Sequence, residues 1–117
     1  MEIQVNPSQY ENLIKARDNW PDRLAITAYN KFHPSMNCIV AYLGTQAGLP
    51  SRVISNDSGA TVLDSTRKKI SEIYEIPKHT LEGWEIINTI HYLFGQERRS
   101  RGMLCRFEKL LDEIEVV

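Results

Sequence analysis

The chain has few of the residues from which metal sites and disulfides are built. It contains two cysteines and three histidines among 117 residues. None of the histidines has a second ligand at a spacing typical of zinc sites, such as His-x-x-x-His or Cys-x-x-Cys. Cys38 and Cys105 both fall at inward-facing positions of expected helices, so we expect reduced thiols in the core and no disulfide. The sequence therefore predicts neither a metal nor another cofactor.

The motifs of common enzyme classes are also missing. There is no Gly-x-Ser-x-Gly elbow, no phosphate-binding Gly-x-x-x-x-Gly-Lys-Ser/Thr loop and no Gly-x-Gly-x-x-Gly sequence after a strand. A cysteine nucleophile needs an exposed, electropositive setting, whereas Cys38 lies in the most apolar stretch. We therefore expect a protein without catalytic activity. Hydrolysis of a nucleotide or nucleic acid is a further alternative, for which no base, nucleophile or metal ligand can be named.

Long apolar runs and a strong charge of one sign are absent as well. No stretch approaches the roughly 18 apolar residues of a membrane span, and the first residues resemble no secretion signal. We expect a soluble, cytoplasmic protein without a membrane partner. The formal net charge of −1 argues against a protein that coats nucleic acid.

The most apolar stretch predicts a buried central helix over 35–48. Its apolar residues occupy one face and both flanks, which is typical of a helix that is covered nearly all round. Ser35 is a suitable N-cap, and Gly48 can adopt the left-handed conformation that ends a helix. The apolar residues are Met36, Cys38, Ile39, Val40, Ala41, Tyr42, Leu43 and Ala47.

Four more helices follow from capping residues and from apolar residues three and four apart. Asn6-Pro7 predicts a helix over 7–18, Asp64 caps one over 65–75, and Thr80 caps one that runs to Gly95. In the helix from Thr80, Leu81, Trp84, Ile87 and Ile90 are expected to face inward. The last helix is expected over 100–115.

Segments 23–32 and 52–55 show patterns typical of short extended stretches that could pair with each other. The expected fold is therefore mainly α: one compact domain spanning 1–117, with about five helices around the central one. A short two-stranded β ribbon between the first and third helices is its one expected β element.

The last helix has the clearest amphipathic pattern in the chain. Burying each large apolar side chain contributes about 1.5–3 kcal/mol, so this wide stripe must cover either the core or a partner. We expect it to form a homodimer interface, built from Met103, Phe107, Leu110, Leu111 and Ile114.

Basic residues form two clusters that could bind an anion or a partner. Arg98, Arg99 and Arg101 lie at the expected entry of the last helix, where the macrodipole disfavours cations. Free backbone N–H groups and guanidinium groups together would bind a phosphate or a carboxylate-rich protein surface. An exposed loop that tolerates arginines is the alternative. The second cluster consists of Arg67, Lys68 and Lys69.

The order of several residues resembles a small uncharacterised helical domain family of bacterial and phage proteins. The resemblance rests on Leu13-x-x-Ala16-Arg17, Trp20, Cys38-x-x-Ala41-x-Leu43, Trp84-x-x-x-Asn88 and Phe107. It implies a compact helical domain and a bacterial or phage source, with the host cytoplasm as the location if the protein is phage-encoded.

Two functions rank above hydrolysis. The first is a non-enzymatic binding protein that acts through protein–protein contacts, with a regulatory or host-defence-modulating role suggested by size and by the resemblance. The second is a binder of a phosphate-bearing small molecule or nucleotide. In that case Arg98, Arg99, Arg101 and Arg67 hold the anion, and Trp84 or Tyr92 stacks on a base.

Overall fold

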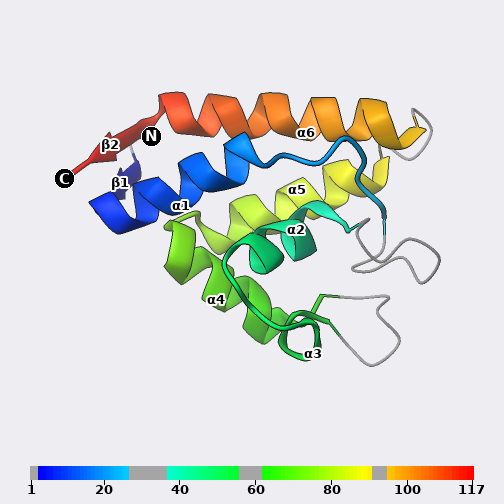
Figure 1. Cartoon of the computed structure of the whole chain (residues 1–117), viewed down its shortest axis with the longest axis horizontal. Helices are drawn as coiled ribbons and strands as arrows, with labels where there is room; N and C mark the ends of the chain where they lie inside the picture. The colour runs from blue at the N-terminus through cyan, green and yellow to red at the C-terminus, as the bar shows by residue number, and fades with distance from the viewer. Residues whose placement is uncertain (1–2, 27–36, 56–61, 91–94) are drawn as a thin grey trace.

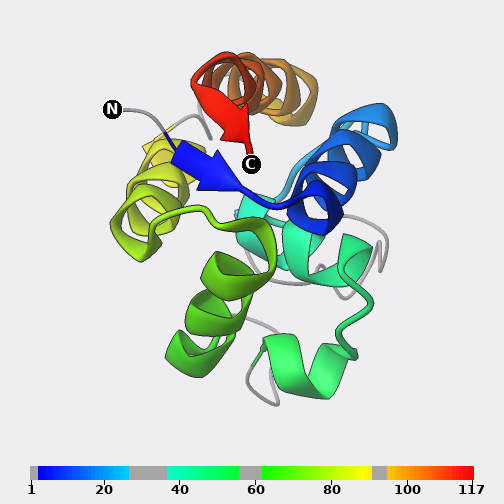
Figure 2. The same ribbon diagram turned by 90° about the vertical axis from the view of Figure 1, so that its left-hand side faces the viewer.

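Helix α2 lies at the centre of the molecule and is surrounded by the longer helices (Figures 1 and 2). The structure, a computed structural model, describes residues 3–26, 37–55, 62–90 and 95–117. These residues form six helices and one two-stranded sheet in a single globule, which confirms the mainly α fold. In chain order the elements are β1 (Ile3–Val5), α1 (Pro7–Asp18), α2 (Ile39–Gln46), α3 (Ser51–Ile54), α4 (Asp64–Tyr74), α5 (Lys78–Ile90), α6 (Gly95–Asp112) and β2 (Ile114–Val116).

The central helix is buried on every side, as its sequence predicts. Each residue from Ile39 to Gly44 is buried. The helix is shorter than expected: Cys38 rather than Ser35 is the N-cap, and the Cys38 Sγ accepts the N–H of Ala41 at 3.5 Å. Ser35 itself lies outside the described residues. Gly48 has the expected left-handed conformation, with φ of +84°.

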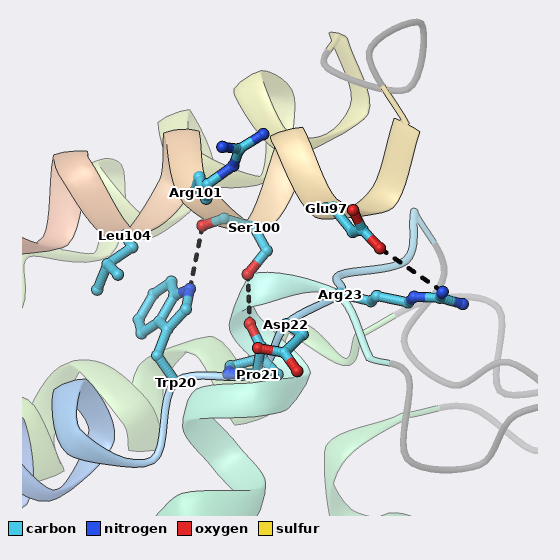
Figure 3. A pocket seen from close by; sticks show the side chains of 8 residues that line it. All are labelled: Trp20, Pro21, Asp22, Arg23, Glu97, Ser100, Arg101 and Leu104. Atoms are coloured by element: carbon cyan, nitrogen blue, oxygen red, sulfur yellow. Dashed lines mark hydrogen bonds and ion pairs between the residues drawn. The ribbon is translucent and has the colours of Figure 1, made fainter.

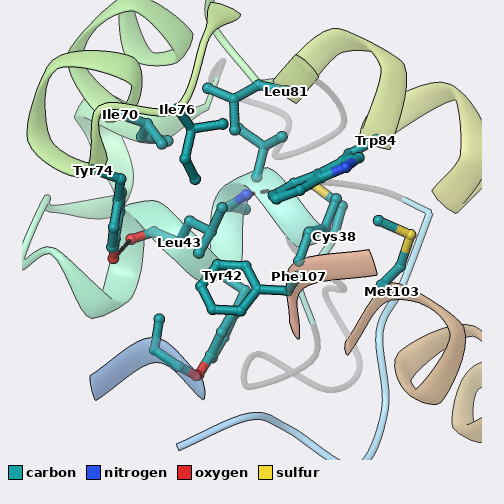
Figure 4. Packing of buried hydrophobic residues seen from close by; sticks show 14 of the residues in the cluster. Cys38, Tyr42, Leu43, Ile70, Tyr74, Ile76, Leu81, Trp84, Met103 and Phe107 are labelled. Atoms are coloured by element: carbon teal, nitrogen blue, oxygen red, sulfur yellow. Dashed lines mark hydrogen bonds between the residues drawn. The ribbon is translucent and has the colours of Figure 1, made fainter. Parts of the chain in front are cut away.

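Two tyrosines and a phenylalanine connect α2 to its neighbours (Figure 4). The Tyr42 hydroxyl donates to the Ala16 carbonyl of α1 at 2.6 Å, and the Tyr74 hydroxyl of α4 donates to the Leu43 carbonyl at 2.8 Å. Phe107 of α6 is completely buried in the same core. Each of the two buried hydroxyls therefore has a hydrogen-bond partner. Without one, a buried hydroxyl would lower the free energy of unfolding by about 1–3 kcal/mol.

Helix α1 has the predicted bounds because its first turn is capped from within. The Asn6 side chain accepts the Gln9 N–H at 2.8 Å, and the Gln9 side chain accepts the Asn6 N–H at 2.8 Å. This reciprocal pair is a capping box, and Pro7 occupies the first helical position.

Three other helices differ from expectation at their ends. α4 begins at Asp64, so its N-cap is Leu63, whose backbone is extended, and the Asp64 carboxylate pairs with Lys78 at 2.9 Å. α5 begins at Lys78, so Thr80 lies inside it, and Ile90 is 60% exposed rather than inward-facing. α6 begins five residues earlier than predicted, at Gly95, and ends at Asp112.

The two-stranded ribbon exists, but its predicted position was wrong. β1 and β2 come from opposite ends of the described chain and pair in parallel, with Ile3 opposite Ile114 (Figure 2). Residues 51–54 instead form the short helix α3, and the described part of 23–32 contains no strand. Parallel strands need a long crossover connection, which here consists of all the helices.

None of the helices within the described ranges is long and apolar enough to cross a membrane.

Candidate functional site

An open pocket lies where the segment after α1 crosses the first turns of α6 (Figure 3). We call it the α6 pocket. It comprises a hollow of about 540 Å³ and an adjoining hollow of about 320 Å³. The larger is lined by Trp20, Pro21, Asp22, Arg23, Glu97, Ser100, Arg101 and Leu104, and the smaller by Arg23, Gly95, Gln96, Glu97, Arg98 and Arg101.

Hydrogen bonds hold one wall of the pocket against the helix. The Trp20 indole N–H donates to the Ser100 carbonyl at 3.0 Å, and the Ser100 hydroxyl donates to the Pro21 carbonyl. Gln96 lies about one helical turn before Ser100. Its carbonyl accepts a hydrogen bond from the Leu24 N–H at 3.4 Å. Trp20 also packs on the core, with its ring 5.2 Å from that of Phe107. The wall is therefore fixed to α6 at several points.

The charges in the pocket favour an anionic ligand. The two hollows are lined by three arginines, Arg23, Arg98 and Arg101, and by two acidic residues, Asp22 and Glu97. Arg23 pairs with Glu97 at 3.6 Å, and both side chains are more than half exposed. Such an exposed pair contributes about 0–1 kcal/mol, so an incoming carboxylate or phosphate could displace it. Arg98 and Arg101 are exposed and have no ion pair with other described residues.

Arg99 does not belong to this exposed cluster, although the sequence placed it there. It is 4% exposed, and its guanidinium group points into the molecule. Its Nε donates to the Asn88 carbonyl at 3.0 Å, and one Nη donates to the Leu24 carbonyl at 2.8 Å. Burial lowers the pKa of Arg99. Arg99 therefore links the segment after α1, through the Leu24 carbonyl, to α5 and α6 on the buried side of the pocket.

The segment behind the pocket is bound by further hydrogen bonds. The Ala25 N–H donates to the Asn37 carbonyl at 2.9 Å, and the Ala25 carbonyl accepts from the Asn88 side-chain amide at 2.8 Å. Together with the bonds of Leu24, every backbone polar group of these two residues has a partner. This arrangement fixes the position of Arg23, the preceding residue.

The second basic cluster lies apart from the pocket residues, and its arginine is already neutralised. The Arg67 Nε lies 2.5 Å from a Glu85 oxygen, and Asp64 approaches to 3.8 Å. The hydrogen bond with Glu85 raises the pKa of Arg67. Lys68 and Lys69 are exposed on α4. None of these three residues lines the α6 pocket, so the two basic clusters do not form one site there.

The aromatic residues expected to stack on a base have other positions. Trp84 is 7% exposed and packs on Phe107 with ring centroids 6.0 Å apart, so it does not offer a free face. Tyr92 lies outside the described residues.

The apolar stripe of the last helix covers the chain's own core. Met103 and Phe107 are completely buried and Leu110 is 7% exposed, while Leu111 and Ile114 are partly buried against the same cluster. Ile114 belongs to β2 rather than to the helix. Met103, Phe107 and Leu110 are therefore occupied within one chain, and the homodimer through this stripe stays a prediction.

The two cysteines differ in environment. Cys38 is buried, and burial raises the pKa of its thiol to about 11, which makes it a poor nucleophile at neutral pH. Cys105 is exposed rather than inward-facing, which corrects its predicted position. Both thiols are free in the structure. Among the described residues no group of three potential ligands could hold a metal ion.

Sequence reasoning found Arg98 and Arg101 but missed the rest of the pocket. Arg23 and Trp20 reach it from a segment more than 70 residues earlier in the chain. The available signal was the Trp-Pro-Asp-Arg sequence after the first helix, in which an aromatic residue and a cation adjoin a helix end.

Comparisons of this chain with models of protein families, with curated proteins and with solved structures found no match.

Proposed function

We propose that this protein is a small non-enzymatic binding protein that docks an acidic segment of a partner protein in the α6 pocket. The observation that carries this proposal is the presence of exposed, unpaired guanidinium groups. Arg98 and Arg101 have no carboxylate partner within the described residues, and they stand beside Arg23. A guanidinium group binds a carboxylate through two parallel hydrogen bonds, which makes arginine well suited to an acidic ligand.

The other wall of the pocket supports a peptide rather than a bare ion. Trp20, Pro21 and Leu104 are each partly exposed and present apolar surface next to the arginines. Figure 3 shows Leu104 directed toward the Trp20 ring, with Arg23 reaching to Glu97 on the far side. A peptide segment with carboxylates beside one apolar side chain would match both the arginines and the apolar wall of the pocket. Such mixed surfaces, in which aromatic residues and arginine adjoin, are typical of protein interfaces.

A phosphate-bearing small molecule is less well supported. Its binding was expected to involve Arg67 and stacking on Trp84, but Arg67 is paired with Glu85 and Trp84 is buried. The pocket is also open to solvent, whereas small-molecule sites commonly enclose most of the ligand. Inorganic phosphate and ATP are included in the test as alternative anionic ligands.

The test is selection from a displayed peptide library, followed by titration of the selected peptides. Trp20 serves as the reporter, because its indole lines the pocket and a bound peptide changes its surroundings. Buried Trp84 supplies a constant background. The test variant is Arg98→Glu with Arg101→Glu. The matched control is Lys68→Glu with Lys69→Glu, which changes the net charge equally at exposed positions outside the pocket.

We expect enrichment of Asp and Glu around one apolar residue in the selected peptides. The Arg98/Arg101 double variant should weaken their binding at least about tenfold, and the lysine control by less than about twofold. Binding should also weaken as salt is raised, because exposed charges are screened. Selection without acidic enrichment, or equal weakening in both variants, would overturn the proposal. A melting temperature raised by inorganic phosphate or ATP, without peptide binding, would replace it with the small-molecule function.

A further inference from the structure

The outward face of α6 carries a row of exposed residues whose charge changes sign along the helix. Two arginines lie in its first turns, a cysteine lies in the middle, and two acidic residues lie in its last turns. Successive members are three, four, three and four residues apart, so they share one face of the helix. We call this set the charged row, and it consists of Arg98, Arg101, Cys105, Glu108 and Asp112.

No described residue covers or neutralises the charged row. The core is met by the opposite face of α6, through Met103 and Phe107, and Figures 1 and 2 show α6 along the outer edge of the molecule. The four charged side chains have no ion pair with another described residue. The helix macrodipole favours the reverse order, with anions near the start of a helix and cations near its end. Interactions within the described chain therefore do not account for this order of charges.

We propose that the charged row packs antiparallel on the charged row of a second copy of this chain. A twofold interface needs a surface that is its own complement. Two positive residues, a neutral centre and two negative residues satisfy this condition once the second helix is turned by 180° about Cys105. Arg98 of each copy then lies opposite Asp112 of the other, and Arg101 lies within one residue, about 1.5 Å along the axis, of Glu108.

The same charges select the orientation of the two helices. A parallel pair would place each arginine opposite the same arginine and each acidic residue opposite its own copy. Charged residues across a helix pair set partner choice and orientation in this way. Beside the row, Lys109 of one copy lies over Gly102 of the other, where no side chain opposes it. The antiparallel pair therefore brings opposite charges together, and the parallel pair does not.

Cys105 lies on the twofold axis of this arrangement. Two helices packed about 10 Å apart bring facing Cα atoms to about 5–6 Å, a separation that a disulfide can span. Cys105 is exposed and Cys38 is buried. A disulfide between two copies therefore reports on the contact through Cys105.

The dimer should be weak, and raised salt should weaken it further. The contact spans 98–112, about four turns or 21 Å of helix. Exposed ion pairs each contribute little and are screened by salt. The proposal does not rest on the proposed function, although Arg98 and Arg101 take part in both. Glu108 and Asp112 do not line the α6 pocket, so replacing them tests the dimer alone.

Sedimentation equilibrium of the reduced full chain, at low salt and up to about 1 mM, tests the proposal. The test variant, Glu108→Arg with Asp112→Arg, makes the whole row positive. The reversed variant adds Arg98→Glu with Arg101→Glu, which restores a self-complementary row with the signs exchanged.

A control and a second measurement separate this contact from general effects of charge. The control variant, Glu11→Arg with Glu72→Arg, changes the net charge equally at exposed positions of α1 and α4. The second measurement is oxidation with diamide, which accepts two electrons and two protons from a pair of thiols as they form a disulfide. Cys105→Ser identifies the thiol that links the copies.

We expect the wild-type chain to dimerise and the test variant to raise the dissociation constant at least about tenfold, because like charges then oppose each other. The control variant should stay within about twofold of wild type, and the reversed variant within about threefold. Diamide should link the wild-type copies through Cys105.

A wild-type chain that is monomeric over the whole series would overturn the proposal. So would a dimer that the test variant leaves intact, a reversed variant that stays monomeric, or a dimer that diamide does not link through Cys105. Peptides selected for the α6 pocket should bind the test variant at least as tightly as wild type. Loss of the dimer and failure of peptide binding are therefore separate results.

Discussion

Replacing Arg99 by methionine tests whether the buried guanidinium group holds the pocket wall to the helices. Methionine retains much of the volume and the apolar stem of the side chain, but it cannot donate. The carbonyls of Asn88 and Leu24, now 3.0 and 2.8 Å from the guanidinium nitrogens, would lose these partners. We therefore expect the free energy of unfolding to fall.

The size of the loss follows from two opposing terms. Hydrogen bonds from a charged donor contribute about 1.5–3 kcal/mol each, so two of them contribute about 3–6 kcal/mol. Removing the buried cation also removes a desolvation penalty, which offsets part of this gain. We expect a net loss of about 2–4 kcal/mol, a large share of the about 5–15 kcal/mol that stabilises a typical domain. Arg99→Lys keeps the charge but not the planar fork, and should lie between wild type and methionine.

Urea unfolding followed by circular dichroism measures this difference. A lower midpoint with an unchanged slope indicates a change in stability alone. Arg98→Met, one residue earlier on the exposed side of α6, is the matched control and should stay within about 0.5 kcal/mol of wild type. If Arg99→Met also lies within that limit, the guanidinium group does not support the wall and the reasoning fails.

Three further predictions concern other parts of the molecule. Glu75 ends α4 with a φ of +56°, so Glu75→Gly should raise the free energy of unfolding by about 0.5–1 kcal/mol in the same urea assay, and a loss would contradict this. A thiol reagent at pH 8 should modify Cys105 alone, because burial raises the pKa of Cys38 to about 11; two rapidly reacting thiols in the native protein would contradict this. Gly44→Val should lower the melting temperature, since even a Cβ would lie 3.1 Å from Cδ1 of Ile54 and overpacking costs about 1–3 kcal/mol; an unchanged melting temperature would show that the core adapts freely.

The helices were the part of the fold most accessible to sequence reasoning. The bounds of α1 were predicted in full because the capping box and Pro7 act within one turn. The start of α4 was predicted within one residue, although Asp64 pairs with Lys78 instead of capping. Local signals thus locate a helix well, even where they misassign the hydrogen bond at its end.

The candidate site could be predicted only in part, because sequence patterns report on residues that are close together in the chain. Arg98 and Arg101 were found because they are close together in sequence, whereas Arg23 joins them only through the crossing of two distant segments. Arg99 was placed with its neighbours, but a helix turns each successive residue by about 100°, which directs Arg99 inward while Arg98 and Arg101 remain outside.

The sequence by itself determined the mainly helical class, the burial of the central helix and the absence of a helical membrane span among the described residues. These properties depend on composition and on the spacing of apolar residues within single segments. Tertiary structure alone decided that β1 pairs with β2, that the stripe of α6 covers the chain's own core, and that Arg99 is buried. Each of these depends on contacts between residues far apart in the chain, whose free energies no local pattern contains.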